Sequence, residues 1–289
     1  MLIKIVLFVF YSFFLSNILI FAQSSDIDKN SSVVYHLDLI EIPAINRLKE
    51  KSVYADIINH SEKNPYSGQS RSTNAHETAH FIHNVLMNAH TISTKKPMNG
   101  FYVLNGKAAV IEEPKMKRSF VKNFVPLKLR SYRWKTYFEK SDWEDRPLYI
   151  LDEWSAYIIG GKVCVDDIKN NRHDGKYTDG VSGCLDFTIY SLSLCIAVKK
   201  FDPDYWHNNE QFKAFIIFQL IESNKIFLAG RGEELLKSEK QDNLLRNLLD
   251  SEEAQPHRDF LNEEFNGLWL DEKTRTSVMT DIIYQSFQK

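Results

Sequence analysis

The sequence predicts an α+β fold that is mainly α-helical, with a small β-hairpin or sheet. Three long apolar stretches have the length and spacing of helices: 147–159, 185–198 and 211–227. Two shorter apolar runs, 101–104 and 108–111, flank Asn105-Gly106. Because Asn-Gly is the favoured two-residue hairpin turn, these runs predict a hairpin. Hydrophobic residues make up 43% of the 289-residue chain, which is ample for the core of one large domain.

The N-terminal stretch 1–23 has the outline of a secretory signal peptide. Lys4 precedes a long apolar run that ends at Ala22. The length of this run also fits an uncleaved N-terminal anchor. The polar residues 24–32 predict a flexible lead-in. We therefore expect a secreted or periplasmic protein with a single domain over 33–289 and no stable membrane insertion after signal cleavage.

The remaining elements follow from local patterns. Alternation over 33–42 predicts a strand, which Pro43 ends, and a short helix is expected over 44–51. Further helices are expected over 130–138, 232–249, 259–269 and 276–287. The C-terminal part is therefore predicted to be helical, but it carries no interpretable motif.

His76-Glu77-Thr78-Ala79-His80 forms an H-E-x-x-H motif. Residues four apart on a helix lie one turn apart on the same face, so the two imidazoles can bind one tetrahedral zinc ion. The intervening glutamate then projects a carboxylate toward the open position of the metal, where it can accept a proton from water. Residues 72–74 offer N-cap side chains, and no proline or glycine interrupts 74–89. The motif is thus predicted to lie on a buried helix.

A third zinc ligand must come from elsewhere in the chain. His83 and Leu86 occupy the glycine and third-histidine positions of the metzincin pattern, so that pattern is absent. The best candidate is Glu153, on a helix that we expect to run from Pro147 and to end at Gly160-Gly161. A carboxylate among hydrophobic residues needs a partner, and a zinc ion would provide one.

Other carboxylates near this position have different expected roles. The adjacent Asp152 points about a quarter-turn away from Glu153, so it is a weaker ligand candidate but can accept a hydrogen bond from a ligand histidine. Glu112 and Glu113 are rival third ligands, ranked lower because they follow the hairpin rather than lie on a helix.

The first motif followed by Glu153-x-x-Ala156 resembles the gluzincin arrangement of zinc metallopeptidases. The chain is also similar to an uncharacterised group of secreted bacterial proteins, through stretches such as 101–105 and 152–157. The gluzincin resemblance implies a zincin-like domain in which His76, His80 and Glu153 bind zinc and Glu77 is the general base. It also implies a tyrosine or histidine that stabilises the oxyanion. Tyr149 and Tyr157 are candidates by helical spacing, and both also fit as core aromatic residues.

The leading prediction is a secreted zinc metallopeptidase that cleaves an amide bond. The alternatives are a non-catalytic zincin-like protein that binds an envelope component, and a helical envelope protein in which the motif is accidental. The net charge of −2 and the lack of a long basic run argue against nucleic acid as a partner. A peptide, a peptidoglycan cross-link and another amide all remain open as substrates, and the oligomeric state is not indicated.

The cysteines and Asp186 each allow two interpretations. The chain has three cysteines: Cys164 and Cys184 are the more plausible disulfide pair, because Cys184 and Cys195 would lie too far apart on one helix. All three remaining reduced is an equal alternative. Asp186 is expected in the first turn of the 185–198 helix, where the helix dipole favours an acid, rather than as a buried functional residue.

Overall fold

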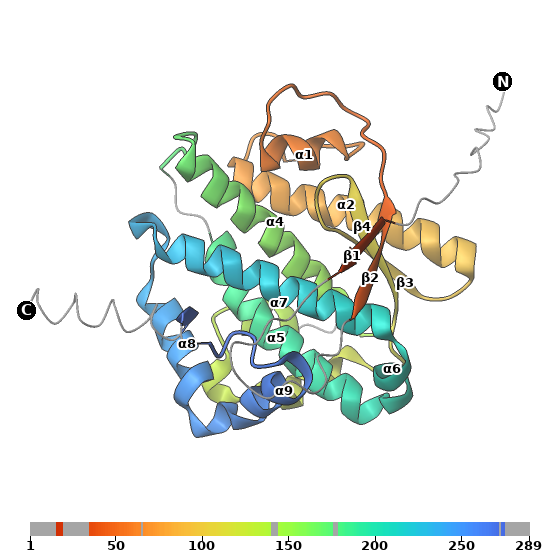
Figure 1. The fold of residues 1–289 in the computed structure, drawn as a ribbon, viewed down its shortest axis with the longest axis vertical. Helices are drawn as coiled ribbons and strands as arrows, with labels where there is room; N and C mark the ends of the chain where they lie inside the picture. Colours follow the sequence, from red (N-terminus) through yellow and green to blue (C-terminus); the bar gives the residue numbers. More distant parts are fainter. Residues whose placement is uncertain are drawn as a thin grey trace, which may run out of the picture.

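The computed structural model describes residues 16–19, 35–64, 66–139, 144–175, 179–271 and 273–274. Most of the expected signal peptide, the lead-in 24–32 and the expected helix 276–287 lie outside these residues. Within them, the fold is mainly helical with a small antiparallel sheet, which confirms the predicted fold class (Figure 1).

The sheet is antiparallel throughout, with the strand order β1-β2-β4-β3. Its strands are β1 (Ser16–Leu19), β2 (His36–Glu41), β3 (Met98–Tyr102) and β4 (Lys107–Glu112). The hairpin between β3 and β4 was predicted. Asn105 and Gly106 have φ of 55° and 65°, as this turn requires, but Leu104 also has a positive φ of 73°. The connection is therefore longer than the expected two residues.

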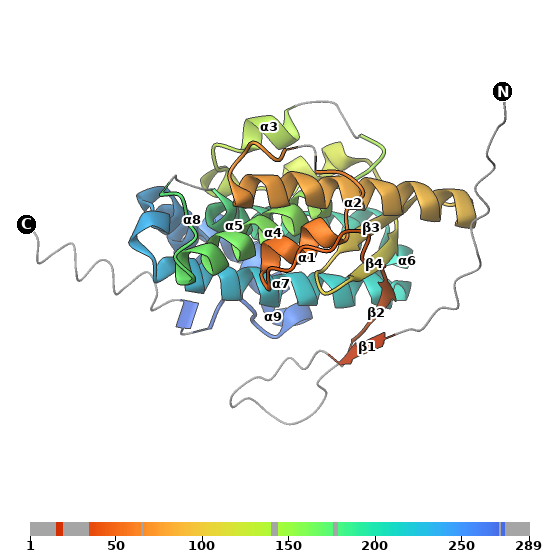
Figure 2. The same cartoon turned by 90° about the horizontal axis from the view of Figure 1, so that it is seen from above.

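The helices are arranged in layers, with α2 on one side of α4 and α5, and α7 on the other (Figure 2). They are α1 (Val53–Asn59), α2 (Arg71–Thr94), α3 (Trp134–Phe138), α4 (Tyr149–Lys169), α5 (Gly180–Phe201), α6 (Pro203–Asn208), α7 (Glu210–Arg231), α8 (Glu239–Asp250) and α9 (Gln255–Phe265). Short 3-10 helices cover Arg118–Phe124, Leu127–Leu129, Glu234–Leu236 and Glu252–Ala254.

Helix α5 is the centre of the core. It contacts α4, α6, α7, α8 and α9. Its length and hydropathy would suit a membrane span, but 94% of its most apolar window is buried inside the protein. Burial of that kind is typical of the core helix of a globular fold, which is surrounded by other helices.

Helix α4 continues through Gly160 and Gly161, so the expected helix end at this pair is wrong. A Cβ on Gly160 would lie 3.1 Å from the carbonyl oxygen of Ser72 in α2, and one on Gly161 would lie 3.3 Å from the carbonyl oxygen of Gly180 in α5. Both glycines therefore allow neighbouring helices to approach α4 closely, and neither ends the helix. The Ser72 hydroxyl also donates a hydrogen bond of 2.8 Å to the Gly160 carbonyl, which ties the two helices together.

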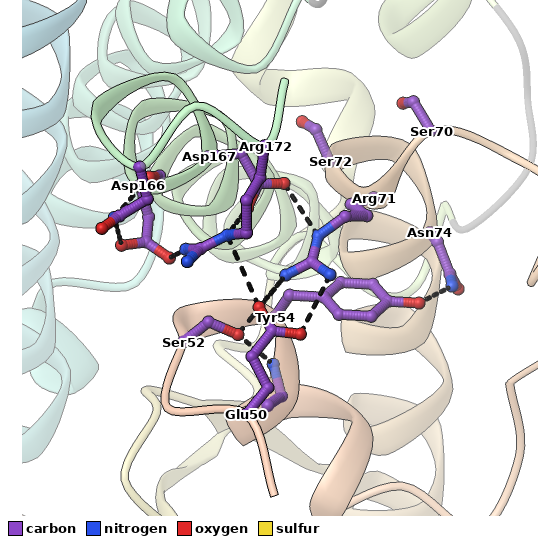
Figure 3. A network of polar contacts seen from close by, with 12 residues as sticks. Glu50, Ser52, Tyr54, Ser70, Arg71, Ser72, Asn74, Asp166, Asp167 and Arg172 are labelled. Atoms are coloured by element: carbon purple, nitrogen blue, oxygen red, sulfur yellow. Dashed lines mark hydrogen bonds and ion pairs between the residues drawn. The ribbon is translucent and has the colours of Figure 1, made fainter. Parts of the chain in front are cut away.

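A polar network anchors the first turn of α2 to α4 and to the segment before α1 (Figure 3). The Arg71 guanidinium lies between Glu50 and Asp167, at 2.6 Å and 2.9 Å, and over the ring of Tyr54. Arg172 binds the second oxygen of Asp167 at 3.0 Å. These contacts place the N-terminal part of α2, which carries the histidine motif, against the C-terminal half of α4.

Three other local expectations are wrong. Residues 72–74 do not cap α2, because the helix begins at Arg71 and the Ser70 hydroxyl accepts from the Thr73 amide. Residues 44–51 form no helix, because their backbone is held in a loop by Asn59, which accepts from Ile45 and Leu48. The helix begins only after Ser52, whose hydroxyl caps the Ala55 amide. In the region 130–138, only Trp134–Phe138 is α-helical.

All three cysteines are described, and none is in a disulfide. Cys164, Cys184 and Cys195 are buried thiols on α4 and α5. The expected Cys164–Cys184 disulfide is therefore not formed, and the alternative of three reduced cysteines is the one the structure has.

Candidate metal centre

A cavity of about 350 Å³ lies between α2, α4 and β3. Its lining comprises His76, Glu77, His80, His83, Asn84 and Met87 from α2, Asn99, Gly100 and Phe101 from β3, Tyr137 and Arg146, and Tyr149, Asp152 and Glu153 from α4. Spacing of three and four residues brings the α2 side chains onto one stripe. The histidine motif therefore faces a hollow rather than packed core.

Three potential ligand atoms converge at one end of this cavity. The Nε2 atoms of His76 and His80 are 3.1 Å apart. The Oε2 atom of Glu153 lies 3.8 Å from the first and 3.5 Å from the second. Ligands about 2.0–2.1 Å from a tetrahedral zinc ion are separated by roughly 3.3 Å, so the three atoms already have suitable spacing.

The hydrogen bonding of these groups also fits a metal. The Oε2 atom of Glu153 is buried and accepts no hydrogen bond from the described residues, while its Oε1 atom accepts one of 2.5 Å from Tyr149. A buried carboxylate oxygen without a hydrogen bond is costly, even with the imidazole of His80 at 3.5 Å. A cation between the two histidines and this oxygen would satisfy it, so the residues fit a zinc ion.

Asp152 orients the histidines from behind. Its two oxygens accept hydrogen bonds from the Nδ1 atoms of His80, at 2.8 Å, and His83, at 2.5 Å. When His80 is neutral, a proton held on Nδ1 by Asp152 leaves the Nε2 lone pair facing Glu153 and His76. The structure thus gives Asp152 the orienting contact expected from the sequence, and adds His83, which the sequence did not connect with the site.

The charges of the site shift several pKa values. Burial, helped by the neighbouring His80, lowers the pKa of His76 to about 3, so this imidazole is neutral near neutral pH. Burial opposes protonation of His80, but Asp152 and Glu153 outweigh it and raise the pKa of His80. The histidines lower the pKa of Asp152 in spite of its burial. A metal must therefore displace a proton from His80, which makes metal binding depend on pH.

Glu77 lies on the cavity side of the motif. Its carboxylate lines the cavity, and no described residue donates a hydrogen bond to it. Burial, together with Glu153 and Asp152, raises the pKa of Glu77. A carboxyl group with a raised pKa and an open environment is suited to accept and release a proton.

The two candidate tyrosines take different positions. Tyr149 lines the cavity, and its hydroxyl contacts Glu153. Tyr157 packs its ring edge-on against His76, with ring centroids 4.5 Å apart, and its hydroxyl contacts Arg133 and Tyr137. The geometry therefore brings Tyr149 to the cavity and gives Tyr157 a packing position behind His76.

An ion pair lies behind Tyr157. Arg133 binds Asp186 on α5 and also Asp179, and both Arg133 and Asp186 have side chains only 3–5% exposed. The expectation of Asp186 in the first turn of its helix is wrong, because α5 begins at Gly180, more than a turn earlier. Asp186 is a buried acid whose partner is 53 residues away in the chain.

The rival ligands Glu112 and Glu113 do not join the three converging atoms. Glu112 pairs with Lys96 at 2.8 Å, and a Glu113 oxygen accepts from the Leu148 amide at 3.1 Å. The cavity also contains Tyr137 and Arg146, neither of which the sequence predicted as part of the metal site. Arg146 comes from the irregular segment before α4 and Tyr137 from the short helix α3, so neither shares a helix with the histidine motif or with Glu153.

Searches against protein-family models, curated proteins and solved structures found no match.

Proposed function

We propose that the protein is an exported zinc metallopeptidase, in which His76, His80 and Glu153 hold the metal. The observation that supports this most strongly is the convergence of three ligand atoms beside a buried carboxylate oxygen without a hydrogen bond. Helical spacing alone would align the two histidines. It would not also bring a carboxylate from a second helix to the same point, with a second acid orienting one of the histidines.

The roles of the side chains follow from their positions. When bound, zinc lowers the pKa of water in its open position and polarises a carbonyl group. Glu77 accepts the proton of the attacking water and delivers it to the leaving amine. Asp152 holds His80 in the tautomer that directs Nε2 into the site. Tyr149 lines the cavity, and its single hydroxyl proton, which it donates to Glu153 in the absence of substrate, can be turned to a developing oxyanion instead.

The metal is tested first, by measuring zinc in the purified mature protein by mass spectrometry. We expect one zinc per chain in the unchanged protein and in His207→Ala, an exposed histidine on α6. We expect its loss in the double variant His76→Ala/His80→Ala. Absence of zinc from the unchanged protein, even after reconstitution, would mean that the motif is an accident of helical spacing.

Catalysis is tested separately with Glu77→Gln. This variant should bind zinc like the unchanged protein and lose at least 100-fold of any peptide hydrolysis, because general acid–base catalysis contributes about 10²–10⁴-fold. Full zinc binding with no hydrolysis by the unchanged protein across a peptide and peptidoglycan panel would instead favour the non-catalytic envelope-binding alternative.

A further inference from the structure

The cavity holds one arginine at a distance from the zinc ligands. Arg146 lies just before α4, and its Nη1 atom donates to the Sδ atom of Met87 at 2.8 Å. Met87 is seven residues after His80 on α2, which is about 10 Å along the helix axis. The guanidinium and the zinc ligands therefore line the same cavity, separated along α2 by about two turns.

The partners of Arg146 do not satisfy its guanidinium. A thioether is a weak acceptor, whereas a guanidinium has five N–H donors. Among the described residues, no carboxylate lies within 4.0 Å of it. Glu113 is near enough for Arg146 to act on it electrostatically, but the Glu113 carboxylate accepts a hydrogen bond from the Leu148 amide and lies more than 4.0 Å from the guanidinium. A half-buried cation is thus left facing the cavity with donors to spare.

Apart from Tyr137 and Tyr149, the other ionisable groups of the cavity are carboxylates and histidines. The carboxylates are Glu77, Asp152 and Glu153, all at the zinc end. Arg146 is the one lysine or arginine among the lining residues in the described part of the chain. The cavity therefore has an anionic end, which a metal would neutralise, and a cationic end where no described carboxylate forms an ion pair with Arg146.

We infer that Arg146 binds a carboxylate group of the substrate, so that the enzyme favours peptides with a negative charge a few residues from the cleaved bond. The inference rests on the proposed peptidase function. Arginine is the residue best shaped for two parallel hydrogen bonds to a carboxylate. A separation of about 10 Å corresponds to roughly three residues of extended peptide. The carboxylate is either the C-terminus of a short peptide or an acidic side chain.

Binding can be measured without turnover in the zinc-loaded Glu77→Gln protein. The probes are four N-terminally blocked pentapeptides of alanine with one phenylalanine. One has a free C-terminal carboxylate and one a C-terminal amide; two further C-terminal amides carry glutamate or glutamine at the fourth position. We expect one of the two acidic peptides to bind at least tenfold more tightly than its neutral counterpart, since hydrogen bonds to charged groups are the strong ones. Which pair shows the preference identifies the source of the carboxylate.

Variants of Arg146 then test whether this residue causes the preference for acidic peptides. Arg146→Met should reduce the preference for acidic peptides to less than twofold. Arg146→Lys keeps the charge but not the two parallel N–H donors of the guanidinium, so it should retain part of the preference. The control Arg246→Met removes an exposed arginine of α8 that binds only Asn243 among the described residues, and should leave the preference unchanged. Thermal melting of each variant checks that it is folded. If Arg146→Met does not fold, the peptide pairs on the otherwise unchanged protein and on Arg146→Lys still decide.

The outcomes separate this inference from the proposed function. Equal binding of acidic and neutral peptides, no binding of any peptide, or a preference that survives in Arg146→Met would overturn the role of Arg146. Hydrolysis by the protein with Glu77 intact, without any preference for a carboxylate, would leave the peptidase function standing. A carboxylate preference that depends on Arg146, without hydrolysis by the zinc-loaded protein, would support the binding role and count against the peptidase function.

Discussion

Replacing Asp152 by asparagine tests the most specific hydrogen-bonding arrangement of the site. The two oxygens of the carboxylate accept from His80 and His83. An amide of the same shape has one acceptor and one donor, so it can accept from only one of these histidines. The other histidine must change its tautomer or lose its hydrogen bond.

The burial of the two histidines predicts which of them loses its hydrogen bond to residue 152. The His83 side chain is 4% exposed and that of His80 is 22% exposed, so an unsatisfied donor costs more at His83. The amide oxygen should therefore turn toward His83, and its NH₂ group toward His80. His80 would then accept at Nδ1 and carry its proton on Nε2, the atom that faces the metal.

The expected magnitude follows from removing the partner of a metal-binding histidine. Such changes typically cost 10–100-fold in metal affinity, or about 1.4–2.7 kcal/mol. We expect Asp152→Asn near the upper end, because the wrong tautomer is enforced. Competition with a chelator of known affinity at constant pH measures the zinc dissociation constant. Asp204→Asn, an exposed acid on α6, is the matched control.

The result that would refute this reasoning is a zinc affinity of Asp152→Asn within twofold of the unchanged protein. That outcome would mean that the tautomer of His80 is not controlled by Asp152, or that zinc does not bind through His80. A variant that loses zinc and also melts at a lower temperature without zinc would show damage to the fold, and the comparison would then be made at equal fractions of folded protein.

Three further changes test the fold around the site. Burial raises the pKa of Glu113 to about 7, so the folded protein keeps a proton that the unfolded chain releases from about pH 4.3. The free energy of unfolding should therefore fall as pH rises between these values, and urea unfolding of Glu113→Gln should lack that part of the fall, which is at most about 4 kcal/mol. An unchanged pH profile would contradict it. Gly160→Ala should destabilise by about 1–3 kcal/mol in thermal unfolding, because its Cβ would lie 3.1 Å from the Ser72 carbonyl; a neutral effect would show that α2 can move aside. Arg133→Met should cost about 3–5 kcal/mol in denaturant unfolding by leaving Asp186 charged and buried, and the added change Asp186→Leu should recover most of the loss; no recovery would refute the pairing.

The parts of the site that were predicted have a local signature. The spacing of His76 and His80 is that of one helical turn, and Glu153 lies within an apolar helical pattern. A periodic pattern reports which side chains share a face of a helix. It therefore identified three residues whose ligand atoms the structure brings together.

The parts that were not predicted depend on contacts between distant segments. Gly160 reads as a helix terminator in isolation, but its role is set by the backbone of α2, which approaches it closely. Arg133 and Asp186 are 53 residues apart, so no window of sequence reveals that they are partners. Arg146 reaches the cavity from an irregular segment, for which periodicity carries no information. Tyr137 reaches it from α3, whose 5 residues are too few to show a helical period.

The three buried thiols can be used to measure how often α4 and α5 separate. Cys164 lies on α4 with Glu153, and Cys184 and Cys195 lie on α5, which packs against α4. Burial raises the pKa values of Cys184 and Cys195, so both thiols are protonated and slow to react while the helices stay packed. The rate at which a thiol reagent labels them therefore measures how often the helix pair that carries part of the site separates, and labelling in the presence and absence of zinc would show whether the metal closes it.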